Sequence, residues 1–223
     1  MLDLIRKLGG LNACLLAFDR LLRRIAGGRM RLYKYYFVAQ PVAKQPWLPP
    51  HRGAGVEIRS VKACDPALAQ FPRPQAVFPR RFAQGALCLA AFKAGSCIGF
   101  LWFTLGPYQE DEVRCRYVPL PEGASAWDFD IYVHPEHRNS IAFLRLWDEA
   151  NRLLAARGIQ WSLSRISAFS KRSMSAHARL AAQRIGTAVF ITLGSWQISV
   201  ATVTPHFFVS RDPRSFPVFA LHP

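Results

Sequence analysis

The segment from Val133 to Arg138 (VHPEHR) follows an apolar-alternating run and precedes a long amphipathic one. This order predicts a strand, a charged turn and the start of a helix. The unpaired amides and the positive end of the helix dipole would point to the place where Arg138 adds a full charge. The corner is therefore predicted to bind an anion, and a ligand that carries phosphate fits it.

The strand expected over residues 127–133 has two kinds of side chain in alternation. Trp127, Phe129, Ile131 and Val133 alternate with Asp128, Asp130 and Tyr132. Because alternate residues of a strand point to opposite sides, the two carboxylates and the phenol are predicted to share one face. A carboxylate there could take a proton from an amine, with Asp130 as the first candidate and Asp128 as the second. The alternative is that both pair structurally with arginines.

A second set of candidates lies on a later helix. Residues 141–157 have the spacing of an amphipathic helix, which is expected to end at Gly158. A strand is expected over residues 160–166. After it, Ser167 or Ser170 can cap a further helix that runs to about Arg184 and ends at Gly186. His177 falls on this helix, and histidine can donate a proton near neutral pH. The alternative is a partly exposed histidine without a chemical role.

The remaining elements define the fold class. We expect a strand over 56–61, an interrupted helix within 65–82, a hairpin of 86–92 and 98–105, a strand over 113–117 and a closing hairpin of 188–193 and 196–202. The acidic run 110–112 is either a solvated loop or a site that attracts a cationic amine. This order predicts an α/β (α+β) fold with a mixed, mostly antiparallel central sheet flanked by helices.

The domain organisation is predicted as an N-terminal amphipathic helix (1–28), a linker (29–55), one domain (56–204) and a C-terminal tail (205–223). In the first segment Leu4, Leu8, Leu11, Leu15, Phe18, Leu22 and Ile25 recur at helical spacing. This helix either packs on the domain or on a partner subunit, as in a homodimer, or anchors the chain peripherally to a membrane surface.

Composition limits the classes of partner. The chain has 223 residues, 51% of them hydrophobic, and a formal net charge of +15, so polyanions should be attracted. Nucleic-acid binding is disfavoured, because no recognised motif is visible and the arginines are scattered. The five cysteines form no CxxC pair and have no metal-ligand spacing, so no metal site is expected and a reducing cytoplasm is favoured. The N-terminus lacks the pattern of a cleaved signal, and no apolar run is long enough to span a bilayer.

Two motifs resemble those of one family. The turn V-H-P-E-H-R at 133–138 is similar to the VxPxxR turn of the GNAT superfamily of acyl-CoA-dependent N-acyltransferases, and A-A-R-G-I at 155–159 ends the following helix as in that family. The segment from Ser170 to Ala181 resembles its late helix, usually written NxxAxxxYxxxG. The family's loop glycines are replaced by Asn139, Ile141 and Phe143. These side chains either obstruct the amides or point into the core.

The resemblance implies a site for acetyl-CoA or another acyl-CoA between two splayed central strands. The backbone from Ile131 to Val133 would pair with the pantetheine arm and stabilise the oxyanion, and residues 138–143 (Arg138, Asn139, Ser140, Ile141, Ala142 and Phe143) would hold the pyrophosphate. His177 stands at the position of the family's tyrosine acid, with Tyr132 as the fallback. Ser170 stands at the asparagine position and would either contact pantetheine or only cap the helix.

The function predicted from these residues is transfer of an acetyl or other acyl group to the amine of a small molecule or sugar. The amine would attack the thioester directly, without a covalent enzyme intermediate. The alternative is a degenerate form of the fold that serves as a basic interaction or membrane-surface module. We expect a cytoplasmic location. Residues 1–28 could in addition bring the protein into peripheral contact with the inner membrane surface.

Overall fold

The structure is a computed structural model that describes residues 5–6, 8–49, 51–138 and 141–223. Leu4, Asn139 and Ser140, which are named above, lie outside the described residues. The chain divides into two compact units, each made of separate segments: unit 1 comprises Met1–Gln40, Gln109–Val118 and Leu163–Pro223, and unit 2 comprises Pro41–Tyr108 and Pro119–Ser162. Each unit is described by itself.

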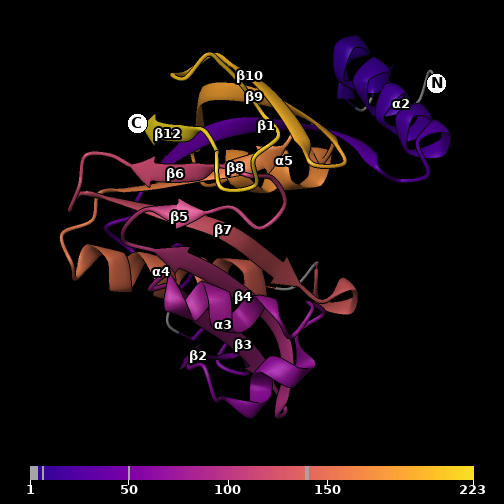
Figure 1. Ribbon diagram of the computed structural model, residues 1–223. Coiled ribbons are helices and arrows are strands. Elements are labelled where there is room, and N and C mark those ends of the chain that lie inside the picture. The colour runs from indigo at the N-terminus through magenta and orange to yellow at the C-terminus, as the bar shows by residue number, and fades with distance from the viewer. Residues whose placement is uncertain (1–4, 7, 50, 139–140) are drawn as a thin grey trace. The chain divides into compact units, whose positions relative to one another are not determined.

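Unit 2 is an antiparallel sheet with helices on its faces (Figure 1). Its strands β2 (Glu57–Val61), β3 (Leu87–Lys93), β4 (Ser96–Thr104) and β7 (Ser125–Val133) have the order β7-β4-β3-β2. Helix α4 (Ala142–Ala155) packs on the sheet. The 3-10 helix η1 (Pro66–Gln70) and helix α3 (Val77–Ala83) join an aromatic core in which Phe71 stacks on Phe100 and Phe78 stacks on Trp102. A second 3-10 turn, η2 (Pro135–His137), connects β7 to α4.

Strand β7 contains a bulge that changes the predicted faces. Asp128 pairs with Phe103 and Asp130 with Trp102, so Phe129 is the extra residue. Neighbouring residues of β4 point to opposite sides, and their partners do the same. The prediction that Asp128 and Asp130 share one face is therefore wrong, because strict alternation ends at Phe129.

Unit 1 contains a second, mostly antiparallel set of strands. Strands β1 (Met30–Pro41), β9 (Gln183–Leu193), β10 (Trp196–Ala201) and β11 (Phe207–Ser210) are joined by β8 (Trp161–Ser167), whose first two residues belong to unit 2, in the order β11-β10-β9-β1-β8. Strand β12 (Val218–Leu221) pairs with β6 (Arg116–Pro119) in a small sheet that also includes β5 (Tyr108–Gln109). Helices α2 (Gly10–Ile25) and α5 (Lys171–Ala178) complete the unit.

The mixed α/β class with a mostly antiparallel sheet and flanking helices is confirmed, and so are both predicted hairpins. Two predicted segments differ. The linker (29–55) contains strand β1, which pairs with β9, and the tail (205–223) contains β11 and β12. Their aromatic residues are part of the core: Phe37 and Phe219 are both fully buried and their rings are in contact. Burial of these rings outweighs the proline signals that favoured irregular chain.

The late helix is shorter than predicted. It ends at Ala178 rather than near Arg184, and Gly186 lies inside β9, opposite Phe37 of β1. Among the described residues, no helix combines the length and apolar character needed to cross a membrane.

Candidate functional site

The edge of β7 that faces away from β4 is the first part of the candidate site. The His134 amide donates to the Ile98 carbonyl over 2.8 Å, and the register continues with Tyr132 opposite Phe100. In an antiparallel pair the bonded positions alternate, so the amides of Ile131 and Val133 point to the opposite edge. The strand is buried over its first four residues and partly exposed over its last five. The backbone amides that were predicted to bind the oxyanion and the pantetheine arm therefore lie in the partly exposed half of the strand, and those of Ile131 and Val133 point outward from the same edge.

The approach of β4 to this part of β7 requires a glycine. A Cβ on Gly99 would lie 2.7 Å from the Tyr132 carbonyl oxygen and 3.4 Å from the Val133 Cα. A side chain at this position would push the two backbones apart and turn the edge of β7 that points away from β4.

Arg138 lies at the end of the same edge. Its Nε donates to the Val133 carbonyl oxygen over 3.2 Å, which places the exposed guanidinium beside the last residue of β7. Helix α4 begins four residues later, the side chain of its N-cap residue Ile141 makes no capping hydrogen bond, and no acidic residue lies in its first turn. These are the features that favour an anion at a helix N-terminus.

The structure shows where the bulky replacement at Ile141 is directed. Gly53 has φ +90°, and a Cβ on it would lie 2.2 Å from Ile141 Cδ1. The Ile141 side chain thus packs against the backbone of Gly53, in a turn that only glycine fits. Ala142 is fully buried, and Phe143 is half-buried.

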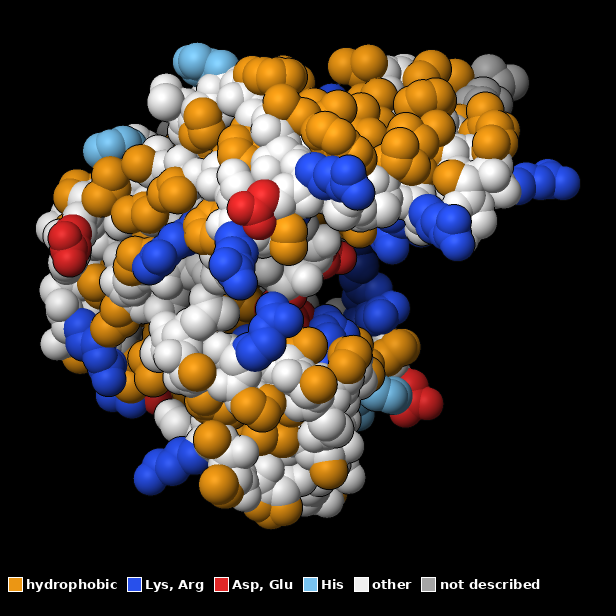
Figure 2. Space-filling view, viewed as in Figure 1, with side chains coloured by type: hydrophobic (Ala, Val, Ile, Leu, Met, Phe, Trp, Pro, Cys, Tyr) orange, Lys and Arg blue, Asp and Glu red, His pale blue; other side chains and the backbone are white. Residues whose placement is uncertain are grey.

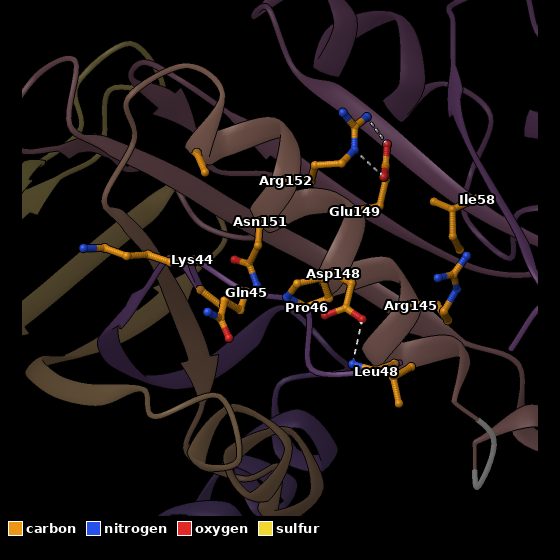
Figure 3. A pocket seen from close by; sticks show the side chains of 12 residues that line it. Lys44, Gln45, Pro46, Leu48, Ile58, Arg145, Asp148, Glu149, Asn151 and Arg152 are labelled. Atoms are coloured by element: carbon orange, nitrogen blue, oxygen red, sulfur yellow. Dashed lines mark hydrogen bonds and ion pairs between the residues drawn. The ribbon is translucent and has the colours of Figure 1, made fainter. Parts of the chain in front are cut away.

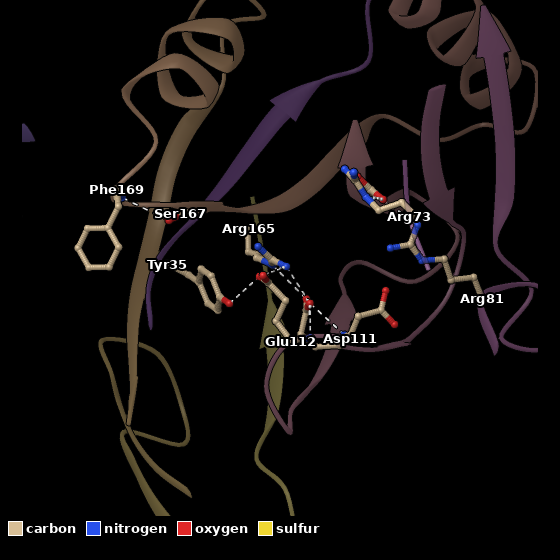
Figure 4. Close-up of polar contacts among 10 residues, drawn as sticks. Tyr35, Arg73, Arg81, Asp111, Glu112, Arg165, Ser167 and Phe169 are labelled. Atoms are coloured by element: carbon tan, nitrogen blue, oxygen red, sulfur yellow. Dashed lines mark hydrogen bonds and ion pairs between the residues drawn. The ribbon is translucent and has the colours of Figure 1, made fainter. Parts of the chain in front are cut away.

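Asp130 is held by two arginines, Arg73 and Arg81, whose side chains are labelled in Figure 4. Arg73 donates from Nε and a terminal nitrogen to the two carboxylate oxygens over 3.0 and 2.7 Å, and Arg81 adds a bond of 2.8 Å. The guanidinium of Arg73 lies over the rings of Phe100 and Tyr132, and that of Arg81 over Trp102 and Phe129. This is the arrangement of the alternative in which the carboxylate pairs with arginines, and its role as a base stays a prediction.

Asp128 lies on the opposite face of β7 and is 3% exposed. Its carboxylate accepts a hydrogen bond from the Ser162 hydroxyl over 2.8 Å. A base must come within hydrogen-bond reach of the acceptor amine, so this burial favours Asp130 over Asp128. Tyr132 is on the Asp130 face, partly exposed, with its ring stacked on Phe100.

His177 is 5% exposed on α5, and its Nδ1 lies 3.3 Å from Gln40 Oε1. Burial lowers the pKa of His177 to about 4. The ring is therefore neutral near pH 7 and does not carry the imidazolium proton that an acid would deliver. The predicted partly exposed histidine is also wrong, because the side chain is enclosed.

Ser170 caps α5. Its hydroxyl accepts the Ser173 amide hydrogen bond at 3.3 Å and lies 2.8 Å from the Ser173 hydroxyl. The capping role is thereby confirmed, and contact with pantetheine stays a prediction.

Two carboxylates of the acidic run in unit 1 are paired with Arg165, and one of them, Glu110, is buried rather than solvated. Glu110 is 5% exposed and accepts two bonds from Arg165, and Glu112 accepts from Arg165 and from the Tyr35 hydroxyl (Figure 4). Burial alone would raise the pKa of Glu110, but Arg165 and two backbone amides hold that pKa below its usual value. The carboxylates are thus occupied by the protein itself.

A cavity of about 430 Å³ lies elsewhere in unit 2, between α4 and the segment that follows β1 (Figure 3). Its polar lining includes Lys44, Asp148, Glu149 and Arg152, but Asp148 accepts the amides of Trp47 and Leu48, and Glu149 pairs with Arg152. None of the site residues predicted from the sequence lines it. Within the described ranges, no group of three or more His, Cys, Asp or Glu residues is placed to hold a metal ion.

Sequence reasoning missed Arg73 and Arg81. Both lie in the proline-interrupted region between β2 and β3, and nothing in their spacing points to Asp130. The bulge at Phe129 was missed as well, because the sequence pattern continues through it.

No family model matches this chain, and no curated protein matches it. Similar solved structures include a functionally unknown conserved protein from Staphylococcus epidermidis, with 11% identity, a TM-score of 0.52 and coverage of 78% of this chain and 66% of that one. They also include a tandem GNAT protein from the clavulanic acid biosynthesis pathway, with 16% identity, a TM-score of 0.49 and coverage of 72% and 53%.

A third is a GCN5-related N-acetyltransferase from Sphaerobacter thermophilus, with 17% identity, a TM-score of 0.49 and coverage of 79% and 55%. The chain thus spans about half to two thirds of the length of these structures. Structures named as a GNAT protein and as an N-acetyltransferase are therefore among those similar to this chain, and the likeness concerns the fold alone.

Proposed function

We propose that this protein is an N-acyltransferase that moves an acetyl or other acyl group from acyl-CoA to the amine of a small molecule or sugar. The observation that carries the proposal is one continuous edge. The amides of Ile131 and Val133 point away from β4, Arg138 lies beside the Val133 carbonyl, and the first turn of α4, which has no acidic residue, follows. An extended chain of amides that ends in a diphosphate is complementary to this edge.

In this proposal the pantetheine arm of the substrate adds to β7 as a further strand. One amide of the Ile131 to Val133 segment donates to the thioester carbonyl oxygen and stabilises the negative charge that develops as the amine attacks. Arg138 and the start of α4, including the amide of the half-buried Phe143, hold the diphosphate. Binding aligns the two reactants, and the protein forms no covalent bond to the acyl group.

Proton transfer is assigned to the face of β7 that carries Asp130 and Tyr132. Because the Asp130 oxygens already accept three guanidinium hydrogens, Asp130 would take the amine proton through a bound water. Tyr132 is the proposed donor to the departing thiolate. It replaces His177 in this role, since burial keeps the His177 ring neutral near pH 7.

A thiol-release assay with acetyl-CoA and a panel of small-molecule and sugar amines tests the proposal. Free CoA should appear only when an acceptor amine is present. Arg138→Ala should weaken acyl-CoA binding by about 1.5 to 3 kcal/mol, the value of a charge-assisted contact. Arg157→Ala is the matched control, because this exposed arginine lies just beyond the far end of α4 and bonds only to the Leu153 carbonyl among its described contacts.

Equal affinities of wild type and Arg138→Ala would remove the diphosphate from this corner. Absence of acyl-CoA binding in the wild type would leave the other candidate, a non-catalytic basic interaction module with this fold.

A further inference from the structure

Helix α2 exposes its apolar side and buries polar residues, the reverse of an ordinary surface helix. Its large apolar side chains Leu11, Phe18, Leu21 and Ile25 form one stripe at helical spacing, and all four are exposed, Leu11 by 68% and Ile25 by 74%. The buried positions of the helix include two polar residues, Asn12 and Asp19. A helix that packs on its own domain normally shows the reverse distribution.

Specific contacts fix this orientation. Asn12 donates to the Tyr36 hydroxyl over 2.9 Å and accepts from Lys34 Nζ over 2.9 Å. Asp19 accepts the Leu32 amide over 2.8 Å and pairs with Arg23 over 2.7 Å. Rotation of the apolar stripe toward β1 would leave these buried polar groups without the partners described here. The polar contacts therefore favour the orientation in which the stripe faces outward.

Strands β9 to β11 show the same inversion on the same face of the sheet. On β10, Gln197 and Ser199 are 1% exposed while the alternate residues are exposed. Gln197 is held by Arg114, whose amide and carbonyl it bonds over 2.8 and 2.7 Å, so the strand cannot shift by one residue without losing both bonds. The exposed residues are Leu193, Trp196, Ile198, Val200, Phe207 and Val209.

Strand register places these residues beside α2. Ile198 pairs with Ile191 of β9, which pairs with Leu32 of β1, and Val200 is related in the same way to Lys34 through Val189. Paired residues share a face of the sheet, and Asn12 and Asp19 of α2 contact β1 on this face. The helix stripe and the strand residues therefore form one surface, called here the apolar face. Figure 2 shows hydrophobic side chains gathered over α2 and continuing over the adjacent end of β9 and β10.

Exposed arginines lie around the apolar face, together with the exposed Asp212 after β11. Arg20, Arg24 and Arg29 are exposed on or just after α2, and Arg211 and Arg214 are exposed after β11. The one acidic residue of α2, Asp19, is buried. A second copy of the chain would bring two sets of arginines together, whereas an anionic lipid surface offers apolar volume and negative charge at once.

We infer that the apolar face of unit 1 docks on an anionic membrane surface, with α2 and the exposed side of β9 to β11 entering the interface together. In this arrangement Trp196 lies at the boundary between headgroups and acyl chains, and the arginines contact phosphate groups. The inference does not depend on the proposed acyl transfer.

Vesicle flotation of the full chain tests the inference, with phosphatidylcholine alone compared with phosphatidylcholine that contains phosphatidylglycerol. Three double variants test separate parts of the surface. The helix variant is Phe18→Gln with Leu21→Gln, and the sheet variant is Ile198→Thr with Val200→Thr. The rim variant, Arg20→Gln with Arg24→Gln, removes two of the arginines around the apolar face. All of these side chains are exposed, and threonine keeps the strand preference of β10. Leu87→Thr is the matched control, an exposed apolar residue on β3 of unit 2.

The wild type should float only with the anionic vesicles, and added salt should weaken its binding. The helix and sheet variants should each bind at least about tenfold more weakly, the rim variant should lose the preference for anionic lipid, and the control should bind as the wild type. Wild-type binding by the sheet variant would overturn the inference, and so would equal binding to neutral vesicles. A dimer in light scattering that the helix and sheet variants dissociate would assign the face to a second copy and overturn it as well.

Discussion

Replacement of Asp130 by asparagine would remove the carboxylate that pairs with Arg73 and Arg81 in unit 2. Arg81 and Asp130 have side chains only 6% and 10% exposed, so their pair is largely shielded from solvent, whereas Arg73 is 31% exposed. The amide keeps the size of the carboxylate but cannot accept charge-assisted bonds at both of its positions. The variant therefore removes the negative charge of Asp130 while it leaves the side-chain volume between β7 and α3 unchanged.

The expected loss follows from this burial. Removal of one partner of a buried ion pair costs about 3 to 5 kcal/mol, because the remaining charge stays desolvated and loses that partner. Cation–π contacts to Trp102 and Phe129 hold the Arg81 guanidinium in place, so that charge cannot move out to solvent at no cost. We expect Asp130→Asn to lower the free energy of unfolding by about 3 kcal/mol.

Urea unfolding of wild type and variant measures this loss. Glu149→Gln is the control, because Glu149 pairs with Arg152 on the surface of α4, where Arg152 is 66% exposed, and its loss should cost less than about 1 kcal/mol. If Asp130→Asn were as stable as the wild type, the two arginines would not depend on this carboxylate, and Asp130 would be free to act as a direct base.

Other measurements test separate parts of the structure. The pKa of His177 is lowered from 6.5 to about 4 in the folded chain. Between these two pH values the unfolded chain binds a proton at His177 that the folded chain does not bind. The free energy of unfolding is therefore fully retained, as far as this group is concerned, above about pH 6.5 and falls by about 3 kcal/mol as the pH approaches 4. His177→Phe should flatten this slope in urea titrations at several pH values, and an unchanged slope would place its origin in another group. Phe219→Ala should lower the free energy of unfolding by about 3 to 5 kcal/mol, because this β12 side chain is fully buried among aromatic rings, and a loss below 1 kcal/mol would mean that the C-terminal strands are dispensable. Phe207→Ala, at an exposed ring of β11, is its control and should change stability by less than about 0.5 kcal/mol.

The fold class and most of the elements could be predicted, because periodicity is a local signal. Hairpins such as Leu87–Lys93 with Ser96–Thr104 show both an apolar run and a tight connection in the sequence. Strand β1 could not be recognised in the same way. It is buried on both faces, so its residues do not alternate, and its pairing with β9 joins segments far apart in the chain.

The chemistry of the candidate site was only partly predictable. The turn with Arg138 and the amides of β7 follow from the order of strand, turn and helix. The partners of Asp130 do not, because Arg73 and Arg81 reach it through tertiary packing of the η1 and α3 region. The bulge at Phe129, which puts Asp128 and Asp130 on opposite faces, has no sequence signal in the alternating pattern of residues 127–133.

The environment of His177 was also set by tertiary structure. Its position on a helix suggested partial exposure, but Gln40 at the end of β1 and the surrounding core enclose the ring. The segment that supplies Gln40 had been predicted to be a linker. The incorrect assignment of this segment therefore left the enclosure of His177 unpredicted.

Calorimetric titration of the purified full chain with acetyl-CoA measures whether the edge of β7 and Arg138 bind an acyl-CoA. We expect saturable binding with one site per chain, weakened about tenfold or more by Arg138→Ala and unchanged by Arg157→Ala. Absence of binding heat at millimolar acetyl-CoA, together with an equally negative result by equilibrium dialysis, would contradict this expectation.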